Sequence, residues 1–241
     1  MGKIWIITKR ELASFFDSLI AYVMIILFLG LSGMFTWLVG TNVFLINQAS
    51  MQVFFSIAFW SLFFFIPAIT MRMIAEENKA GTIELLITKA VTDNQIVLGK
   101  FFACLILVII ALVCTLPYYI TLSQLGNVDD GAVIGGYMAL LMLSASYISI
   151  GLFSSSLTQN QIVAFLMALT IGICFHLLFD VIGNTIRGSA GSVFNYLSMS
   201  THFESMSRGV VDSRDLVYFI SIIVLGLLAS QVMLSKRNWQ S

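Results

Sequence analysis

Charge is scarce in this sequence. Asp, Glu, Lys and Arg make up 10% of its 241 residues, and 59% of the residues are hydrophobic. An ordinary soluble domain carries about 25% charged residues, so this composition excludes a soluble globular protein and indicates a chain surrounded by lipid. The formal net charge is zero, and the sequence therefore lacks the basic field that would predict a nucleic-acid partner.

Cysteine and proline are also few. Cys104, Cys114 and Cys174 all fall in apolar stretches, without the Cys-x-x-Cys or Cys/His spacing of a zinc site. This pattern excludes a disulfide framework and predicts no bound metal, so we interpret the three thiols as small packing residues. Pro67 and Pro117 are the two prolines. They lie within or near the ends of the second and third apolar stretches and predict kinks there.

Long apolar stretches are abundant. There are six, near residues 21–40, 53–74, 97–121, 132–154, 162–183 and 216–235. Each is close to the roughly 20 residues that a helix needs to cross about 30 Å of hydrocarbon, whereas barrel strands would be alternating segments of about 10 residues. The sequence therefore predicts an all-α bundle of six transmembrane helices, formed as a single domain over residues 1–241.

The positions of lysine and arginine predict the orientation. Most lie on the side of the N-terminus: Lys3, Lys9, Arg10, Arg72, Lys79, Lys89, Lys100, Lys236 and Arg237. The other side has Arg187, Arg208 and Arg214. Because cytoplasmic loops carry the excess of basic residues, both termini are predicted to be cytoplasmic.

Residues 1–19 precede the first apolar stretch. Charged residues interrupt this segment, and no small-residue cleavage site follows a compact apolar core, so we do not expect it to be a signal peptide. Its large apolar residues cluster at helical spacing: Trp5, Leu12, Phe15, Phe16 and Leu19. We expect a helix lying in the inner membrane interface. The alternative is a cytoplasmic extension of the first span.

A charged island, residues 72–86, separates the second and third stretches. Glu76, Glu77 and Glu84 supply three of the twelve acidic residues of the chain. A charge at the centre of a membrane helix costs about 2.5 to 3.5 kcal/mol, so the island is predicted to lie outside the bilayer, where it meets a soluble partner.

The island has its own start and stop signals. Gly81 is suited to end the helix that leaves the second span, and Thr82 to cap a short helix over residues 83–89. Leu85 and Leu86 would be exposed on that helix, so a partner is expected to cover them. Thr92 and Gln95 have the spacing of a capping box that starts the third span. A short helix held between two spans is suited to transmit a push into the membrane.

The motif Glu76-Glu77, followed by Gly81-Thr82-x-Glu84-x-Leu86 after the second of six spans, resembles the membrane subunit of ABC-2 (type V) exporters. The resemblance continues through the loop at residues 154–161 and the pattern at residues 202–219. That last pattern is most similar to the gliding-motility and copper-enzyme-maturation branch. Ala90 departs from the family, in which proline is common after the double leucine.

The resemblance implies a coupling helix that docks in a groove of an ABC ATPase. The interface would comprise Arg72, Glu76, Glu77, Gly81, Thr82, Glu84, Leu85 and Leu86. It also implies two permease subunits, a homodimer or a pair of related chains, with two ATPases in the inner (cytoplasmic) membrane of a bacterium. An extracytoplasmic auxiliary protein is a further candidate partner.

This chain itself is not expected to be an enzyme. It has no G-x-x-x-x-G-K-[S/T] loop, because Gly99-Lys100 is followed by Phe101 and lacks the glycine-rich cradle that a phosphate needs. We therefore expect no cofactor in this chain, with ATP and Mg²⁺ held by the partner ATPase.

The outer segment, residues 184–214, is the other informative loop. Relatives are similar in placing short re-entrant or interfacial helices here, which close the exit side. The resemblance makes Phe194, Tyr196 and Phe203 the candidates for an outer gate. The alternative is an ordinary interfacial loop.

His176 and Asp180 are ionisable residues inside the fifth span. At positions i and i+4 they share a helix face and could pair. A proton or substrate role is one interpretation. The pair lies near the outer end of its helix, which favours a structural role in helix pairing or interfacial anchoring.

Three functions compete. An exporter subunit explains the spans, the island and the lack of catalytic residues, and a mechanical complex that moves no solute is a variant of it. An intramembrane protease would need an organised nucleophile, yet the sequence around Ser154 is not a G-x-S-x-G element and Asp180 has no second membrane aspartate. A channel or secondary carrier would usually place charged groups near the bilayer middle. The substrate is not specified by any motif.

Overall fold

The computed structural model describes residues 2–39, 43–46, 48–81, 92–186 and 188–237, and within these ranges the chain forms helices and no strand. The elements are α1 Gly2–Asp17, α2 Ile20–Trp37, α3 Val43–Ile46, α4 Gln52–Ala80, α6 Asp93–Val113, α7 Leu116–Leu125, α8 Asp130–Ser156, α9 Gln161–Ile173, the π-helical turn η1 Cys174–Leu178, α10 Phe179–Thr185, α11 Ser189–Leu197, α12 Met199–Ser207 and α13 Ser213–Arg237. The predicted all-α class is confirmed.

Six helical segments of the described chain are long and apolar enough to span a membrane. They are Ile20–Trp37, Gln52–Ala80, Asp93–Leu125, Asp130–Ser156, Gln161–Thr185 and Ser213–Lys236. Each contains most of one predicted apolar stretch, so the six-span prediction is confirmed. The third span consists of α6 and α7, and the fifth of α9, η1 and α10.

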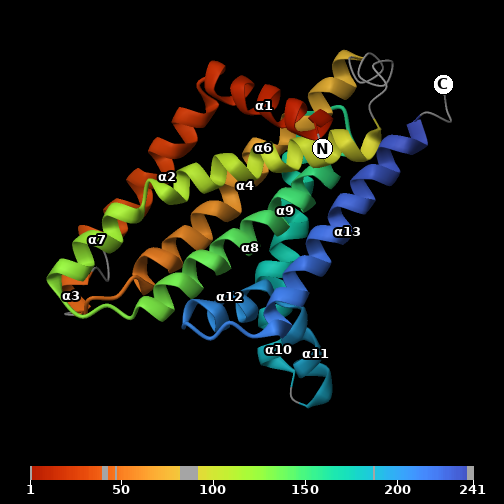
Figure 1. Ribbon diagram of the computed structural model, residues 1–241. Coiled ribbons are helices and arrows are strands. Elements are labelled where there is room, and N and C mark those ends of the chain that lie inside the picture. Colours follow the sequence, from red (N-terminus) through yellow and green to blue (C-terminus); the bar gives the residue numbers. More distant parts are fainter. Residues whose placement is uncertain (1, 40–42, 47, 82–91, 187, 238–241) are drawn as a thin grey trace.

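Figure 1 shows how these helices are arranged. Helix α1 lies across one end of the bundle, where α4 and α13 also end; we call this the α1 end. Helix α2 runs from there to the opposite end, which carries α3 and α7. Helices α10 and α11 project from that opposite end, which we call the α11 end.

The core of the bundle is formed by α4, α6 and α8. In the spans that contain α4, α6 and α8, 56%, 61% and 72% of the most apolar stretch is buried inside the structure. In the spans that contain α2, α9 and α13, the corresponding shares are 28%, 22% and 22%. Small residues let the central helices approach closely: a Cβ on Gly151 of α8 would lie 2.0 Å from the Thr70 hydroxyl of α4. Close packing and interhelical hydrogen bonds hold membrane helices together, because lipid supplies no hydrophobic drive between them.

The two prolines act differently. Pro67 lies inside α4, where the Thr70 hydroxyl donates to the carbonyl of Ile66 at 2.9 Å. Pro117 lies in the first turn of α7, and the third span is interrupted between Val113 and Leu116. A proline is tolerated in a first turn because its missing N–H has no helical partner there. The bend predicted in the third span is thus a break between two helices.

Candidate functional site at the α1 end

Helix α4 ends where the sequence predicts. Gly81 adopts the left-handed conformation, with φ of 67°, and its N–H donates to the carbonyl of Glu77. The capping box that starts α6 is also confirmed, since the Thr92 hydroxyl accepts from the N–H of Gln95 and the Gln95 side chain accepts from the N–H of Thr92.

The predicted docking helix between α4 and α6 lies outside the described residues. The same holds for four of the predicted interface residues: Thr82, Glu84, Leu85 and Leu86. What the structure describes is the pair of helix ends that bracket this segment, and these ends carry the charges discussed next.

Four charged side chains from three helices meet at the α1 end. This charge cluster consists of Arg10 and Glu11 from α1, Glu77 from α4 and Lys100 from α6. The Lys100 ammonium lies 2.8 Å from Glu77 Oε1 and 3.4 Å from Glu11 Oε1. Arg10 pairs with Glu11 and lies 3.3 Å from Glu77 Oε1. Two cations and two carboxylates thus neutralise one another.

Burial makes this cluster sensitive to the loss of any member. The Lys100 side chain is 1% exposed, and those of Glu11 and Glu77 are 13% and 18% exposed. An unpaired ion in such a site would lose several kcal/mol of hydration energy. Glu77 Oε2 is buried with no hydrogen-bond partner among the described residues, so the lysine is the main compensation for this carboxylate.

The field of the cluster shifts the pKa values of its α1 members. Burial alone would raise the pKa of Glu11, but Lys100 and Arg10 outweigh it and hold the pKa below its ordinary value. Burial opposes the charge on Arg10, whereas its bond to Glu11 and the nearby Glu77 raise its pKa overall. Both shifts favour the charged forms at neutral pH.

A glycine allows α1 to reach α6. A Cβ on Gly99 would lie 2.6 Å from Cγ2 of Ile7 and 3.3 Å from the carbonyl oxygen of Ile4. The Thr8 hydroxyl donates to the Gly99 carbonyl at 3.1 Å. Gly99, which precedes Lys100 in the sequence, therefore lets α1 pack closely against α6.

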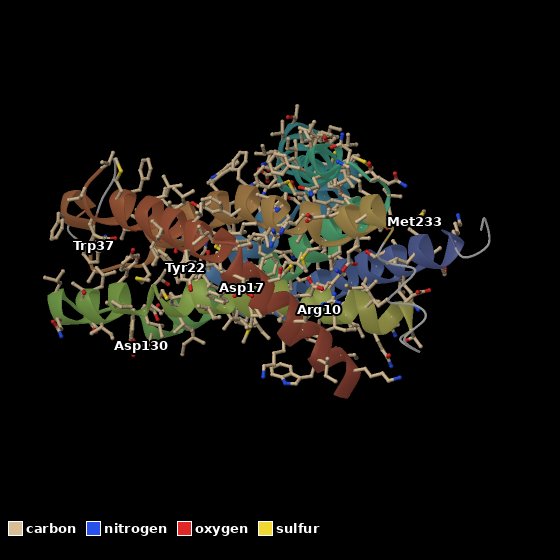
Figure 2. The ribbon with its side chains drawn as sticks, turned by 90° about the horizontal axis from the view of Figure 1, so that it is seen from above. Arg10, Asp17, Tyr22, Trp37, Asp130 and Met233 are labelled. Atoms are coloured by element: carbon tan, nitrogen blue, oxygen red, sulfur yellow. The ribbon has the colours of Figure 1, made fainter. Side chains whose placement is uncertain are left out.

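Arg72 of α4 fastens the other end of α1. Its guanidinium lies 5.3 Å from the centroid of the Phe15 ring and donates to the Ser18 hydroxyl at 3.2 Å. Figure 2, which looks onto the α1 end, shows α1 crossing the bundle obliquely, with Arg10 and Asp17 along it. Leu19 has φ of 60° and separates α1 from α2. Helix α1 is thus separate from α2, and a straight extension of the first span does not form. The position of α1 in the inner membrane interface stays a prediction.

The structure assigns different surroundings to the two neighbouring glutamates. Glu76 is exposed, whereas Glu77 points into the charge cluster. Successive residues on a helix point about 100° apart, which follows from 3.6 residues per turn. Sequence reasoning missed Arg10, Glu11 and Lys100 as members of the cluster around Glu77. The available signal was opposite charge: Arg10 lies before the first apolar stretch and Lys100 near the start of the third, and both are cations.

At the α11 end, His176 and Asp180 do not pair. His176 Nδ1 bonds to the Tyr147 hydroxyl of α8, and its Nε2 has no partner among the described residues. The His176 ring is stacked on Phe59 at 4.0 Å. Asp180 accepts instead from Asn184 at 3.2 Å. The predicted pairing assumed regular α-helix, but the π-helical turn η1 widens the helix at His176 and changes the residues that share a face.

The described part of the outer segment contains the short helices that the sequence predicts, and their re-entrant or interfacial position stays a prediction. Helices α11 and α12 occupy it. Phe203 is 3% exposed and packs on Phe59 with ring centroids 4.5 Å apart. Phe194 lies near Phe179 at 6.1 Å, and Tyr196 is 52% exposed. These three aromatic side chains face different neighbours, and their role as an outer gate stays a prediction.

Comparison with known proteins places the chain in a family. The sequence profile described as ABC-2 family transporter protein matches residues 23–204. This range includes the described members of the charge cluster on α4 and α6 and ends within α12. No curated protein matches the chain. Within the described residues, no group of three or more His, Cys, Asp or Glu side chains could hold a metal ion.

Proposed function

Because the chain belongs to the ABC-2 transporter family, whose members are membrane subunits and not enzymes themselves, we propose that it couples ATP hydrolysis by a separate ATPase to export of a substrate. In this proposal the chain forms the translocation path with a second permease subunit in a bacterial cytoplasmic membrane. Two ATPase subunits bind ATP and Mg²⁺ at the α1 end.

One observation carries the proposal: the charge cluster joins the helices on both sides of the predicted docking helix. Glu77 lies three residues before the end of α4 at Ala80, and Lys100 is the eighth residue of α6. Their contact at 2.8 Å ties these ends together, and Arg10 and Glu11 tie α1 to both. A push on residues 82–91 would therefore displace three helices as one unit.

The distribution of charge supports a cytoplasmic α1 end. Basic residues of this end come from α1, from the C-terminal parts of α4 and α13 and from the start of α6: Lys3, Lys9, Arg10, Arg72, Lys79, Lys100 and Lys236. Arg208 and Arg214, in contrast, lie at the end of α12 and the start of α13. This asymmetry is what the positive-inside rule predicts for a cytoplasmic α1 end.

The two glutamates of α4 then have separate roles. Glu76 is exposed. In this proposal it binds the ATPase, together with Glu84, Leu85 and Leu86 of the predicted docking helix. Glu77 is held by Lys100 and transmits force inside the subunit. Charge reversal at Glu76 should weaken association with the ATPase, whereas loss of Glu77 should leave the ATPase bound and uncouple it.

The test is purification of the chain from its native host with an affinity tag. We expect an ABC ATPase in the purified complex, less of it with Glu76→Lys, and a wild-type amount with Glu77→Gln. In nanodiscs, the wild-type membrane subunit should change the ATPase activity of its partner. The Glu77→Gln subunit should bind the ATPase without causing this change in activity. Recovery of the wild-type chain without any ATPase would overturn the proposal. Equal ATPase recovery with both variants would overturn the division of roles.

A further inference from the structure

His202 of α12 is buried between two hydrogen-bond acceptors. Its Nδ1 lies 2.6 Å from Oδ1 of Asp215 in the first turn of α13, and its Nε2 lies 2.9 Å from the backbone oxygen of Tyr196 in α11. The exposed fractions of His202 and Asp215 are 4% and 5%. One histidine thus connects three helices of the α11 end.

The geometry sets the number of protons in this site. A carbonyl oxygen can only accept a hydrogen bond, and an ionised carboxylate is also only an acceptor. A neutral imidazole has a single N–H and can satisfy one of the two contacts. Both contacts are made when the ring carries two protons. Because imidazole is a stronger base than a carboxylate, the second proton belongs on His202 and the negative charge on Asp215.

The surrounding rings suit a cation. The Tyr218 ring lies parallel to the His202 ring, with centroids 4.0 Å apart and an interplanar angle of 23°. A positive charge over an aromatic face gains cation–π attraction. The Tyr218 hydroxyl donates to the backbone oxygen of Leu197, which ties the end of α11 to α13 by a second route.

We propose that His202 is held as an imidazolium ion and that its charge latches α12 to α13, so that the position of α12 depends on this proton. The inference stands whether or not the chain couples to an ATPase, since it concerns only contacts within the α11 end. His176, the other histidine of the chain, differs because its Nδ1 is hydrogen-bonded to the Tyr147 hydroxyl and not to a carboxylate.

Movement of α12 would reshape a cavity. Phe203 follows His202 and packs on Phe59 of α4. Both phenylalanines line a cavity of about 250 Å³ between α4, η1, α10 and α12. The latch therefore fixes one wall of this cavity through the residue next to His202.

Other titratable groups near the latch come from each element packed on α12. They are Tyr196 of α11, Tyr218 of α13, Tyr147 of α8, His176 of η1, and Glu204 and Arg208 of α12 itself. Glu204 and Arg208 are exposed and pair with each other at 3.2 Å. Asp215 is the charged side chain in direct contact with the ring.

Two histidines in the chain allow a direct experiment. The full chain is labelled with ¹³C,¹⁵N-histidine, reconstituted in nanodiscs and measured by NMR at pH 7.5, with His176→Gln used to assign the signals. We expect one doubly protonated ring, from His202, and one neutral ring. Asp215→Asn should convert His202 to a neutral ring, and Asp212→Asn should not, because Asp212 is exposed and bonds to the N–H of Arg214.

Hydrogen exchange measured at the same pH tests the mechanical part. The amides of α12 should exchange at least several-fold faster in Asp215→Asn than in the wild type and Asp212→Asn. Two neutral histidine rings in the wild-type chain at pH 7.5 would overturn the proposal, and this result needs no variant that must fold. A charged ring together with unchanged exchange of α12 in Asp215→Asn would overturn the latch.

Discussion

Replacement of Lys100 by methionine tests how strongly the charge cluster holds α1 to the bundle. Methionine has a similar length and suits the apolar part of the site, so the substitution removes the charge and leaves little empty space. Glu11 and Glu77 would then share the site with Arg10 alone. The Arg10 side chain is 51% exposed, so it is screened by water and compensates poorly.

The magnitude follows from the burial of the carboxylates. Removal of one partner from a buried ion pair costs about 3 to 5 kcal/mol, because it leaves an uncompensated charge. Glu11 and Glu77 keep 13% and 18% of their side chains exposed and retain Arg10 nearby. Because of this exposure and the nearby Arg10, we expect a loss at or below the lower limit of that range, about 2 to 3 kcal/mol. Lys79→Met is the matched control, since Lys79 is exposed at the end of α4, and should cost less than about 1 kcal/mol.

The assay is unfolding of the detergent-purified chain, followed by helical circular dichroism. Glu77→Gln combined with Lys100→Met should cost less than the two single losses added together, because the double variant leaves one fewer uncompensated ion. If Lys100→Met were no more destabilising than Lys79→Met, the cluster would not hold the helices together. Additive losses in the double variant would likewise contradict a direct pair between Glu77 and Lys100.

Three further predictions use the same measurement. The depressed pKa of Glu11 means that its stabilisation is complete above the ordinary glutamate pKa of about 4.3 and is lost as the pH falls through the lower folded-state pKa; Glu11→Gln should remove this part of the acid sensitivity and no alkaline part. Gly99→Ala should cost about 1 to 3 kcal/mol, because the new Cβ meets Ile7. The matched change Gly30→Ala, with no atom within 4 Å of the new Cβ, should be neutral or stabilising. Tyr147→Phe should cost about 1 to 3 kcal/mol, because it removes the partner of a buried histidine.

The sequence predicts those features of this fold that depend on neighbouring residues. Hydropathy locates the spans because each must cover the hydrocarbon thickness on its own. The end of α4 at Gly81 and the capping box of Thr92 and Gln95 are also local features, and the structure confirms both. In each case a few adjacent residues satisfy their own backbone groups, and no tertiary contact is needed to decide the outcome.

The charge cluster could not be predicted in this way. Glu76 and Glu77 are adjacent and identical, and the direction in which each points depends on where α1 and α6 lie. Lys100 meets a residue 89 positions away in the chain at 3.4 Å, and this contact requires the approach of α1 that Gly99 permits. The same limit explains His176, since its partner is set by the turn η1 and by packing on α8.

The two ends of the bundle are fastened in a way that differs from its core. Helices α4 and α8 are held by close contacts at glycines of α8, because lipid supplies no hydrophobic drive between helices and close packing takes its place. Helices α1 and α12 are short, and each is joined to its neighbours by buried charge: the charge cluster in one case and the pair of His202 with Asp215 in the other. A buried ion pair contributes little net stability but is costly to break by the loss of one partner. Such contacts fix the positions of α1 and α12 against their neighbours. A change of protonation or a mechanical force can break them while the core helices stay packed. This makes α1 and α12 the elements through which events at either end of the subunit would be transmitted to the packed spans.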